Sequence, residues 1–255
     1  MKKEKRGQVT IFIIIAIIIV AIALLIYSFY PEIKASLGLE AQTPSGFIQS
    51  CLEEQIKTDV EKLSAQGGSL APEHYIMYNN EKIEYLCYIN EYYKTCIVQQ
   101  PMLKEHIESE IKNEIRGEVT ACFNSLKENY EKRGYDVNMK EGGTTVELLP
   151  KRIASTFNYS LTLAKGGDTA QYNSFSVVLN NNLYELISIA NSILNWEVSY
   201  GDAETTTYMN YYHDLKVEKR KQSDGTKIYI LTDRNTENKF QFASRSFAWP
   251  PGFGV

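Results

Sequence analysis

The sequence predicts an α+β protein in which an N-terminal transmembrane helix precedes an extracytoplasmic domain with two amphipathic helices and a mainly antiparallel β-sheet. Three observations predict it: a long uncharged segment near the start, apolar residues repeated every three or four positions in two later segments, and β-prone stretches after residue 142. Of the 255 residues, 44% are hydrophobic and 23% are charged, which is typical of a folded chain. Wholesale disorder and fibrous repeats are therefore excluded.

The membrane helix is expected within residues 7–30, which contain no Asp, Glu, Lys, Arg or His. Its apolar part, residues 9–30, has 22 residues and as a helix would be about 33 Å long, enough to cross a hydrocarbon layer about 30 Å thick. Isoleucine dominates the segment and is a mediocre helix former in water. In lipid, however, every backbone amide must be bonded within the segment, which favours a helix.

The charges around this segment predict its orientation. Residues 1–6 form a basic tail with one acidic residue, Glu4, and four basic ones, Lys2, Lys3, Lys5 and Arg6. Because positive charge is retained on the cytoplasmic side, we expect the N-terminus in the cytoplasm and the C-terminal domain outside, in a single-pass protein of the cell membrane. Of 27 basic and 31 acidic residues, 23 and 30 then lie outside, a net charge of −7 that argues against a nucleic-acid partner.

A cleaved secretory signal is the alternative interpretation of the same segment. Residues 21–23, Ala-Ile-Ala, have the small-x-small pattern of a cleavage site. Cleavage there would leave residues 24–30 as an apolar stub on a soluble protein, and the apolar region would exceed the usual length of a signal. The membrane anchor is therefore the preferred interpretation, and it makes the lipid bilayer a partner.

Residues 5–10 have the sequence Lys-Arg-Gly-Gln-Val-Thr, a basic pair and a glycine followed by a glutamine that opens an apolar helix. This start resembles the class III signal sequences of archaeal pilin-like proteins, which a prepilin-type peptidase cuts on the cytoplasmic side. The resemblance covers about residues 1–30 and implies cleavage between Gly7 and Gln8. The acidic residue that the family usually carries five positions into the mature chain falls on Phe12, so the charge associated with subunit registration is missing here.

The region from residue 31 to residue 141 is expected to hold a neck and a helical subdomain. Residues 31–46 contain two prolines and two glycines and read as a neck. In residues 47–141, apolar side chains recur at helical spacing over 48–63 and again over 103–126, and Gly134 is the natural end of the second helix. Residues 75–98, rich in Tyr and Ile, are either two short strands or a compact loop.

Residues 142–255 are expected to form a sheet-rich subdomain. β-prone stretches occupy 144–149, 153–163 and 175–179, helical spacing returns over 183–196, and further strands are expected at 215–219, 227–231 and 240–243. Ser223, Asp224 and Gly225 predict a turn between two of these strands. The tail 249–253, Trp-Pro-Pro-Gly-Phe, either docks on its own sheet, which we prefer, or offers a partner a polyproline-like strip.

Four cysteines lie in the outer region, and an even number in an oxidising compartment predicts two disulfides with three alternative pairings. We prefer Cys51 with Cys122, because each lies on the apolar face of its helix, which leaves Cys87 with Cys96 to close a short loop. A zinc site needs paired ligands two to four residues apart, whereas the spacings here are 36, 9 and 26 residues.

The sequence predicts no catalytic residue, no cofactor site and no metal site. The three histidines, His74, His106 and His213, are far apart in sequence, and each is expected to be an isolated surface side chain. No Gly-x-Ser-x-Gly elbow surrounds a serine, and no Gly doublet is followed by Lys-Ser or Lys-Thr, so neither a hydrolase triad nor a phosphate loop is indicated. Asn158 opens an Asn-Tyr-Ser triplet, an acceptor for N-glycosylation, inside an expected strand.

Eighteen tyrosines, many of them clustered around residues 75–93 and 208–212, either fill half-buried strand faces or form aromatic contact surfaces. The sequence therefore predicts a membrane-anchored cell-surface or envelope protein that acts in binding or structural contacts, with other envelope or filament proteins as partners. The alternative is a pilin-like filament subunit processed between Gly7 and Gln8. An extracytoplasmic enzyme is the third hypothesis, and no constellation of residues favours it.

Overall fold

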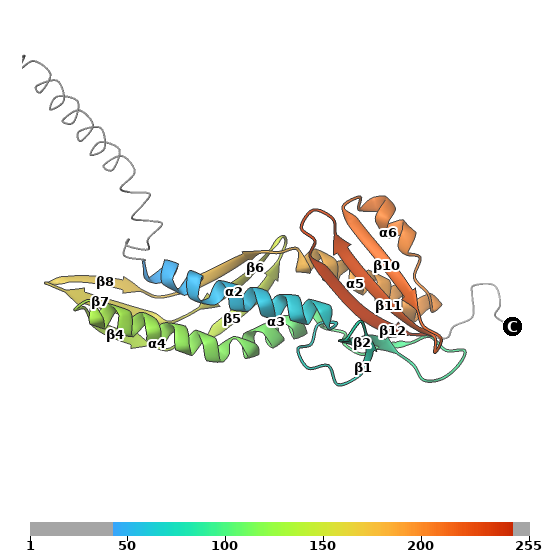
Figure 1. Ribbon diagram of the computed structural model, residues 1–255, viewed down its shortest axis with the longest axis horizontal. Coiled ribbons are helices and arrows are strands. Elements are labelled where there is room, and N and C mark those ends of the chain that lie inside the picture. The colour runs from blue at the N-terminus through green and yellow to red at the C-terminus, as the bar shows by residue number, and fades with distance from the viewer. Residues whose placement is uncertain (1–42, 247–255) are drawn as a thin grey trace, which may run out of the picture. The chain divides into compact units, whose positions relative to one another are not determined.

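The computed structural model describes residues 43–246 and has an α+β fold with mainly antiparallel sheets (Figure 1). The expected basic tail, membrane helix and Gly7–Gln8 cleavage site lie outside the described residues, as do the tail 249–253 and all of the neck except its last few residues. Among the helices of residues 43–246, none combines the length and the apolar character that crossing a bilayer requires.

Helix α2 (Pro44–Ala65) is the first amphipathic helix expected from the sequence, and it takes in the end of the expected neck. Its predicted apolar face is buried, through Ile48, Leu52, Ile56, Val60 and Leu63. Two glycines with positive φ follow the last residue of the helix, and the amide of Gly68 donates to the carbonyl of Leu63. Glycine adopts this left-handed conformation without strain.

The second expected helix is divided at Ile115 into α3 (Leu103–Glu114) and α4 (Arg116–Lys132). The predicted apolar face nevertheless stays buried along both helices, at Leu103, Ile107, Ile111, Ile115, Val119, Phe123 and Leu126. Backbone bonds from Ile115 to Ile111 and from Val119 to Ile115 continue through the division, so the axis is interrupted without a reversal of the chain. Helix α3 packs against β5 and α4 against β4, and these strands belong to two different sheets.

Six consecutive strands form two three-stranded antiparallel sheets, together called the meander here: β4 (Asp136–Lys140), β5 (Thr144–Leu149), β6 (Arg152–Phe157), β7 (Ser160–Lys165), β8 (Asp168–Tyr172) and β9 (Phe175–Asn180). They pair as two sheets with the orders β4-β7-β8 and β5-β6-β9. The chain therefore passes from one sheet to the other between β4 and β5, between β6 and β7, and between β8 and β9. The single strand expected over 153–163 is therefore two strands, separated at Asn158 and Tyr159. Every odd-numbered residue from Ile153 to Leu163 is still buried, because the alternation of faces passes unbroken through the division.

The remaining strands form one six-stranded sheet from both ends of the described chain. It contains β1 (Tyr75–Tyr78), β2 (Glu81–Tyr88), β3 (Ile97–Val98), β10 (Leu215–Lys221), β11 (Thr226–Asp233) and β12 (Lys239–Arg245). Residues 75–98, expected as two short strands or a compact loop, hold three strands and a loop over 89–96. Asn79 and Asn80, both with positive φ, form the two-residue turn between β1 and β2. The predicted turn at 223–225 connects β10 and β11.

The ranges 47–141 and 142–255, expected as two subdomains, are joined in the structure by this sheet. Strand β2 pairs in parallel with β12, with Tyr85 opposite Ala243. Helix α5 (Leu183–Tyr200), close to the helix expected over 183–196, contacts β11, β12 and β2 at the six-stranded sheet and also β5 and β6 in the meander. One continuous hydrophobic core therefore runs from α2 to β12. The short helix α6 (Thr205–Tyr211) packs on β10 and was not expected.

Both disulfides have the predicted pairing. Cys51 in α2 bonds to Cys122 in α4 with a Cα–Cα distance of 6.1 Å, and Cys87 in β2 bonds to Cys96 with a distance of 5.4 Å. The first joins α2 to α4 across 71 residues of sequence, but Cys51 is exposed, whereas it was expected on the buried apolar face of its helix. The second holds the segment before β3 against the six-stranded sheet.

Gly142 lies at the division between the two meander sheets, and we predict that Gly142→Ala destabilises the fold. A Cβ atom at this position would stand 1.8 Å from the carbonyl oxygen of Asn158, too close for any contact, so the chain must shift. Overpacking of this kind costs about 1–3 kcal/mol. Gly143→Ala is the matched control, because a Cβ there meets nothing within 4 Å. Equal unfolding free energies of the two variants in denaturant titrations would show that the close approach is unimportant.

Candidate functional site

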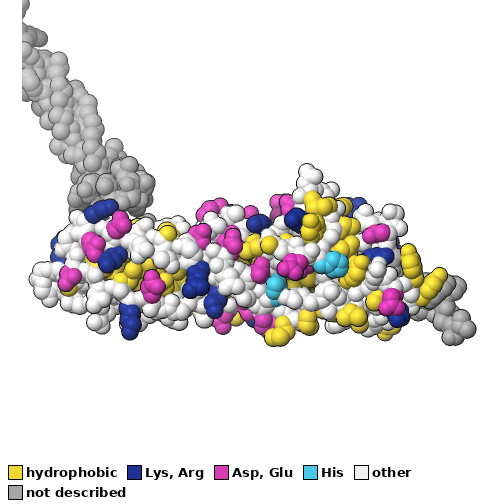
Figure 2. Space-filling view, turned by 90° about the horizontal axis from the view of Figure 1, so that it is seen from below, with side chains coloured by type: hydrophobic (Ala, Val, Ile, Leu, Met, Phe, Trp, Pro, Cys, Tyr) yellow, Lys and Arg dark blue, Asp and Glu magenta, His cyan; other side chains and the backbone are white. Residues whose placement is uncertain are grey.

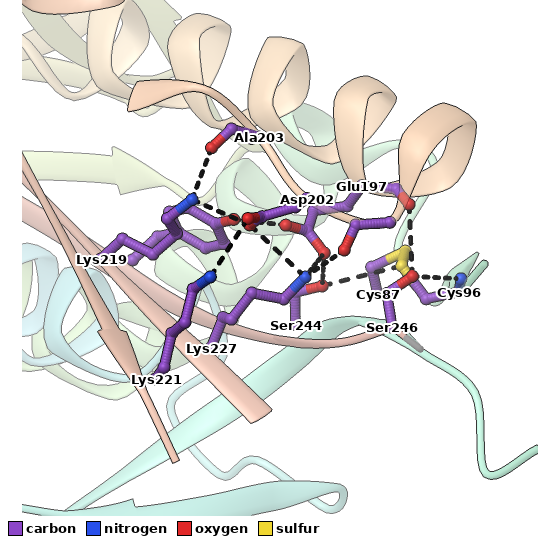
Figure 3. Close-up of polar contacts among 12 residues, drawn as sticks. Cys87, Cys96, Glu197, Asp202, Ala203, Lys219, Lys221, Lys227, Ser244 and Ser246 are labelled. Atoms are coloured by element: carbon purple, nitrogen blue, oxygen red, sulfur yellow. Dashed lines mark hydrogen bonds and ion pairs between the residues drawn. A yellow bond between two sulfur atoms is a disulfide. The ribbon is translucent and has the colours of Figure 1, made fainter. Parts of the chain in front are cut away.

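A buried polar cluster lies between α5 and strands β11 and β12 (Figure 3). Glu197 of α5 is fully buried, and its carboxylate lies 2.6 Å from the ammonium of Lys227, itself only 5% exposed. Lys227 also donates to the carbonyl of Gly201 and lies 3.8 Å from Asp202. Glu197 and Gly201 therefore take up two of its hydrogens, and Asp202 adds a carboxylate at longer range. An amine enclosed by these acceptors is not arranged as a nucleophile.

The carboxylate of Glu197 is satisfied by neutral donors as well. The hydroxyl of Ser244 donates to it at 2.9 Å, and the phenol of Tyr229 donates to its other oxygen. Burial, together with the nearby charge of Glu197, raises the pKa of Tyr229, so the phenol keeps its proton. The cluster reaches the second disulfide through Ser246, which accepts a bond from the amide of Cys96 and donates to the carbonyl of Glu197. These contacts hold α5, β11, β12 and the disulfide together, which is a structural role.

A hollow of about 500 Å³ opens beside this cluster, with the exposed rings of Trp196 and Tyr200 on its wall. The two rings lie one helical turn apart on α5, with centroids 5.0 Å from each other. Asp202 lines the same hollow. Burial alone would raise the pKa of Asp202, but the hydrogen bond from Lys219 and the charges of Lys227, Lys219 and Lys221 outweigh it and lower the pKa, so the carboxylate is ionised at neutral pH.

A second polar cluster brings Ser69 between His106 and Glu84. The hydroxyl of Ser69 lies 2.8 Å from Nε2 of His106 and 2.5 Å from a carboxylate oxygen of Glu84, and the neighbouring amide of Leu70 donates to Glu110. With Glu84 ionised, the only proton of the hydroxyl goes to the carboxylate, so His106 donates to Ser69 rather than accepting from it. A serine nucleophile requires the opposite direction, with the acid on the far side of the imidazole.

The structure places the other residues noted in the sequence as follows. Asn158 is exposed between β6 and β7, so its side chain is accessible for glycosylation, although its backbone is tied to Gly143. His74 packs its ring against Tyr85 and Tyr88, whereas His213 is exposed. His106 belongs to the cluster around Ser69, which sequence reasoning missed because its members are far apart in the chain. Within residues 43–246, no group of three or more His, Cys, Asp or Glu side chains is placed to hold a metal ion.

The exposed large apolar side chains gather around the six-stranded sheet. On the face shown in Figure 2, hydrophobic side chains collect toward the part of the molecule that carries this sheet, and charged side chains are prominent over the helices packed on the meander. One group lies in the segment from β1 to α3, with Tyr75, Met77, Tyr92, Tyr93, Ile97 and Met102. The other lies on α5 and α6, with Trp196, Tyr200, Tyr211 and Tyr212. Outside these groups, only Val178 of the described large apolar residues is comparably exposed.

Compared with known protein families, curated proteins and solved structures, the chain shows no match.

Lys227→Met is predicted to destabilise the fold strongly. The substitution leaves the fully buried carboxylate of Glu197 without its cation, and removal of one partner of a buried ion pair costs about 3–5 kcal/mol. Lys221→Met is the control, because the ion pair of Lys221 with Asp202 is exposed and an exposed pair contributes less than about 1 kcal/mol. The double variant Glu197→Gln, Lys227→Met should recover part of the loss. Similar unfolding free energies for the two single variants would contradict the assignment.

Glu84→Gln is predicted to change the pH dependence of stability. Burial, followed by the charges of Glu110 and Glu73, raises the pKa of Glu84 above its ordinary value of 4.5 despite the hydrogen bond from Ser69. The folded protein therefore binds this proton more tightly than the unfolded chain, and the stability contributed by Glu84 falls as the pH rises from 4.5 through the raised pKa. Relative to the wild type, the glutamine variant should gain stability with rising pH in thermal unfolding measured from pH 4 to pH 8. The exposed Glu105→Gln is the control, and parallel curves for wild type and Glu84→Gln would refute the prediction.

Proposed function

We propose that the chain is a single-pass, membrane-anchored protein of the cell surface or envelope, whose outer domain makes binding or structural contacts with other surface proteins. The observation that carries the proposal is that all four cysteines of the sequence are paired in two disulfides. Disulfides of this kind persist in oxidising compartments. The uncharged residues 7–30 and the basic tail before them supply the anchor and its orientation, with the bilayer as a partner.

The exposed aromatic groups around the six-stranded sheet support contact as the mode of action. Tyr and Trp are enriched where proteins bind partners, because a large ring gives contact area at low cost in conformational entropy. The polar clusters around Glu197 and Ser69 favour a binding role over catalysis, since neither presents a nucleophile. We therefore propose a binding or structural protein rather than an enzyme.

A pilin-like filament subunit is the second candidate. It is favoured by the sequence around Gly7 and Gln8, which resembles the class III signals of archaeal pilin-like proteins. In that case the apolar helix of the mature chain would pack against other subunits. The missing acidic residue at Phe12 favours the anchored protein instead.

The location is tested by adding protease to sealed cells that produce the protein. We expect digestion of the bulk of the chain without lysis, because the domain faces outward. Digestion that occurs only after lysis would overturn the proposal. Reduction before the assay is a useful control for protease resistance, since the disulfides cross-link α2 to α4 and Cys87 to Cys96.

The mass of the native N-terminus distinguishes the two candidates. A chain that begins at Met1 or Lys2 fits the anchored protein, and one that begins at Gln8 fits the filament subunit. A chain that begins at Leu24 would instead indicate a cleaved secretory signal and would contradict both.

A further inference from the structure

A groove of about 650 Å³ lies between the first half of α5 and the chain that follows α6. Tyr184, Tyr211 and Tyr212 line it, and Leu186, Ile189 and Leu215 contribute apolar surface. Tyr211 and Tyr212 are 79% and 56% exposed, much more than the tyrosines of the core. Much of the surface of these two side chains is therefore accessible to a ligand.

The charges along this groove are mostly negative. Glu185, Asp214 and Asp233 line it together with one lysine, Lys151, and one histidine, His213. Asp233 is occupied by protein donors, because the amide of Asn182 and the backbone amides of Asn235 and Thr236 all donate to it. Glu185 accepts the backbone amide of Lys151 with one oxygen, and its other oxygen has no partner among the described residues. Asp214 is exposed.

The walls of the groove are held in place before any ligand arrives. The hydroxyls of Tyr208 and Ser192 are hydrogen-bonded at 2.8 Å and fix α6 to α5. The amide of Tyr212 donates to the carbonyl of Tyr208, and the amide of Leu215 donates to the carbonyl of Tyr212, which fixes the turn that carries the two exposed rings. A preformed site avoids part of the entropic cost of binding.

We propose that this groove binds a Lys or Arg side chain of a partner protein. A cation is attracted to the face of an aromatic ring and to carboxylates, and the groove offers both beside apolar surface for the methylene stem of such a side chain. The exposed carboxylate of Asp214 favours a ligand that only donates hydrogen bonds, as an ammonium or a guanidinium does. A saccharide, which needs donors from the protein as well as acceptors, is the alternative ligand, because tyrosine hydroxyls and Lys151 also line the groove. This inference rests on the proposed binding function and names the chemistry of the partner.

The test uses the purified, oxidised full-length protein and two short peptides, acetyl-Gly-Lys-Gly-amide and its norleucine counterpart. Saturation-transfer NMR should detect the lysine peptide through its side-chain methylenes, with an affinity that weakens as salt is added. The norleucine peptide, which keeps the stem and lacks the charge, should bind at least about fivefold more weakly. Methyl glucoside is the probe for the saccharide alternative.

Two variants locate the site. Tyr212→Leu removes a ring and keeps apolar volume, and Asp214→Asn removes a charge and keeps shape; each should weaken binding of the lysine peptide by roughly fivefold. Tyr92→Leu, at an exposed tyrosine outside the groove, should leave the affinity unchanged. Both sites are exposed, and an unchanged unfolding midpoint shows that a variant has folded.

The proposal is overturned if the lysine and norleucine peptides bind equally, if both groove variants keep the wild-type affinity, or if methyl glucoside binds and the lysine peptide does not. Because the assay uses purified protein, its failure leaves the surface location intact. Conversely, a failure of the protease test on cells would leave the affinity of the groove unaffected.

Discussion

The ion pair between Glu197 and Lys227 sets the position of α5, and much of the surface depends on where this helix lies. An unpaired carboxylate in that interior would be very costly, which disfavours any register of α5 on β11 and β12 that separates Glu197 from Lys227. Ser244 and Tyr229 complete the hydrogen bonds of the same carboxylate, and Ser246 extends the contacts to the disulfide of Cys96. The hollow beside Trp196 and the groove beside Tyr184 lie along this one helix.

A second constraint lies in the meander and the helices packed on it, where the helices and the strands are interrupted at matching places. Helices α3 and α4 separate at Ile115, and the meander separates into two sheets at Asn158. The stacking of Phe123 on Tyr159, with ring centroids 3.9 Å apart, joins α4 to the dividing point of the meander. Gly142 allows the backbone of Asn158 to approach at the same place. The disulfide between Cys51 and Cys122 then holds α2 to α4.

The polar interior and the aromatic exterior have different roles. Inside, the charges of Glu197 and Lys227 are paired, and the serine beside His106 gives its proton to a carboxylate, so these groups stabilise or specify the fold. Outside, most of the exposed large rings lie around the six-stranded sheet. This arrangement agrees with the proposed binding function, in which the surface contacts a partner and the interior holds that surface in place.

The sequence by itself determined the fold class, the buried faces of α2, α3 and α4, the helix near residue 183, the turn at 223–225 and both disulfide pairings. These depend on the local spacing of apolar residues, on glycine conformation, or on the place of each cysteine in an element that the local sequence already specifies. Tertiary structure alone decided that β2 joins β12, that residues 153–163 are divided between two sheets, and that Ser69 meets His106 and Glu84. It also decided that Tyr184 and Tyr212 share a groove with Glu185. Contacts between residues far apart in the chain produce no periodic pattern in the sequence, because they depend on how the helices and strands pack together.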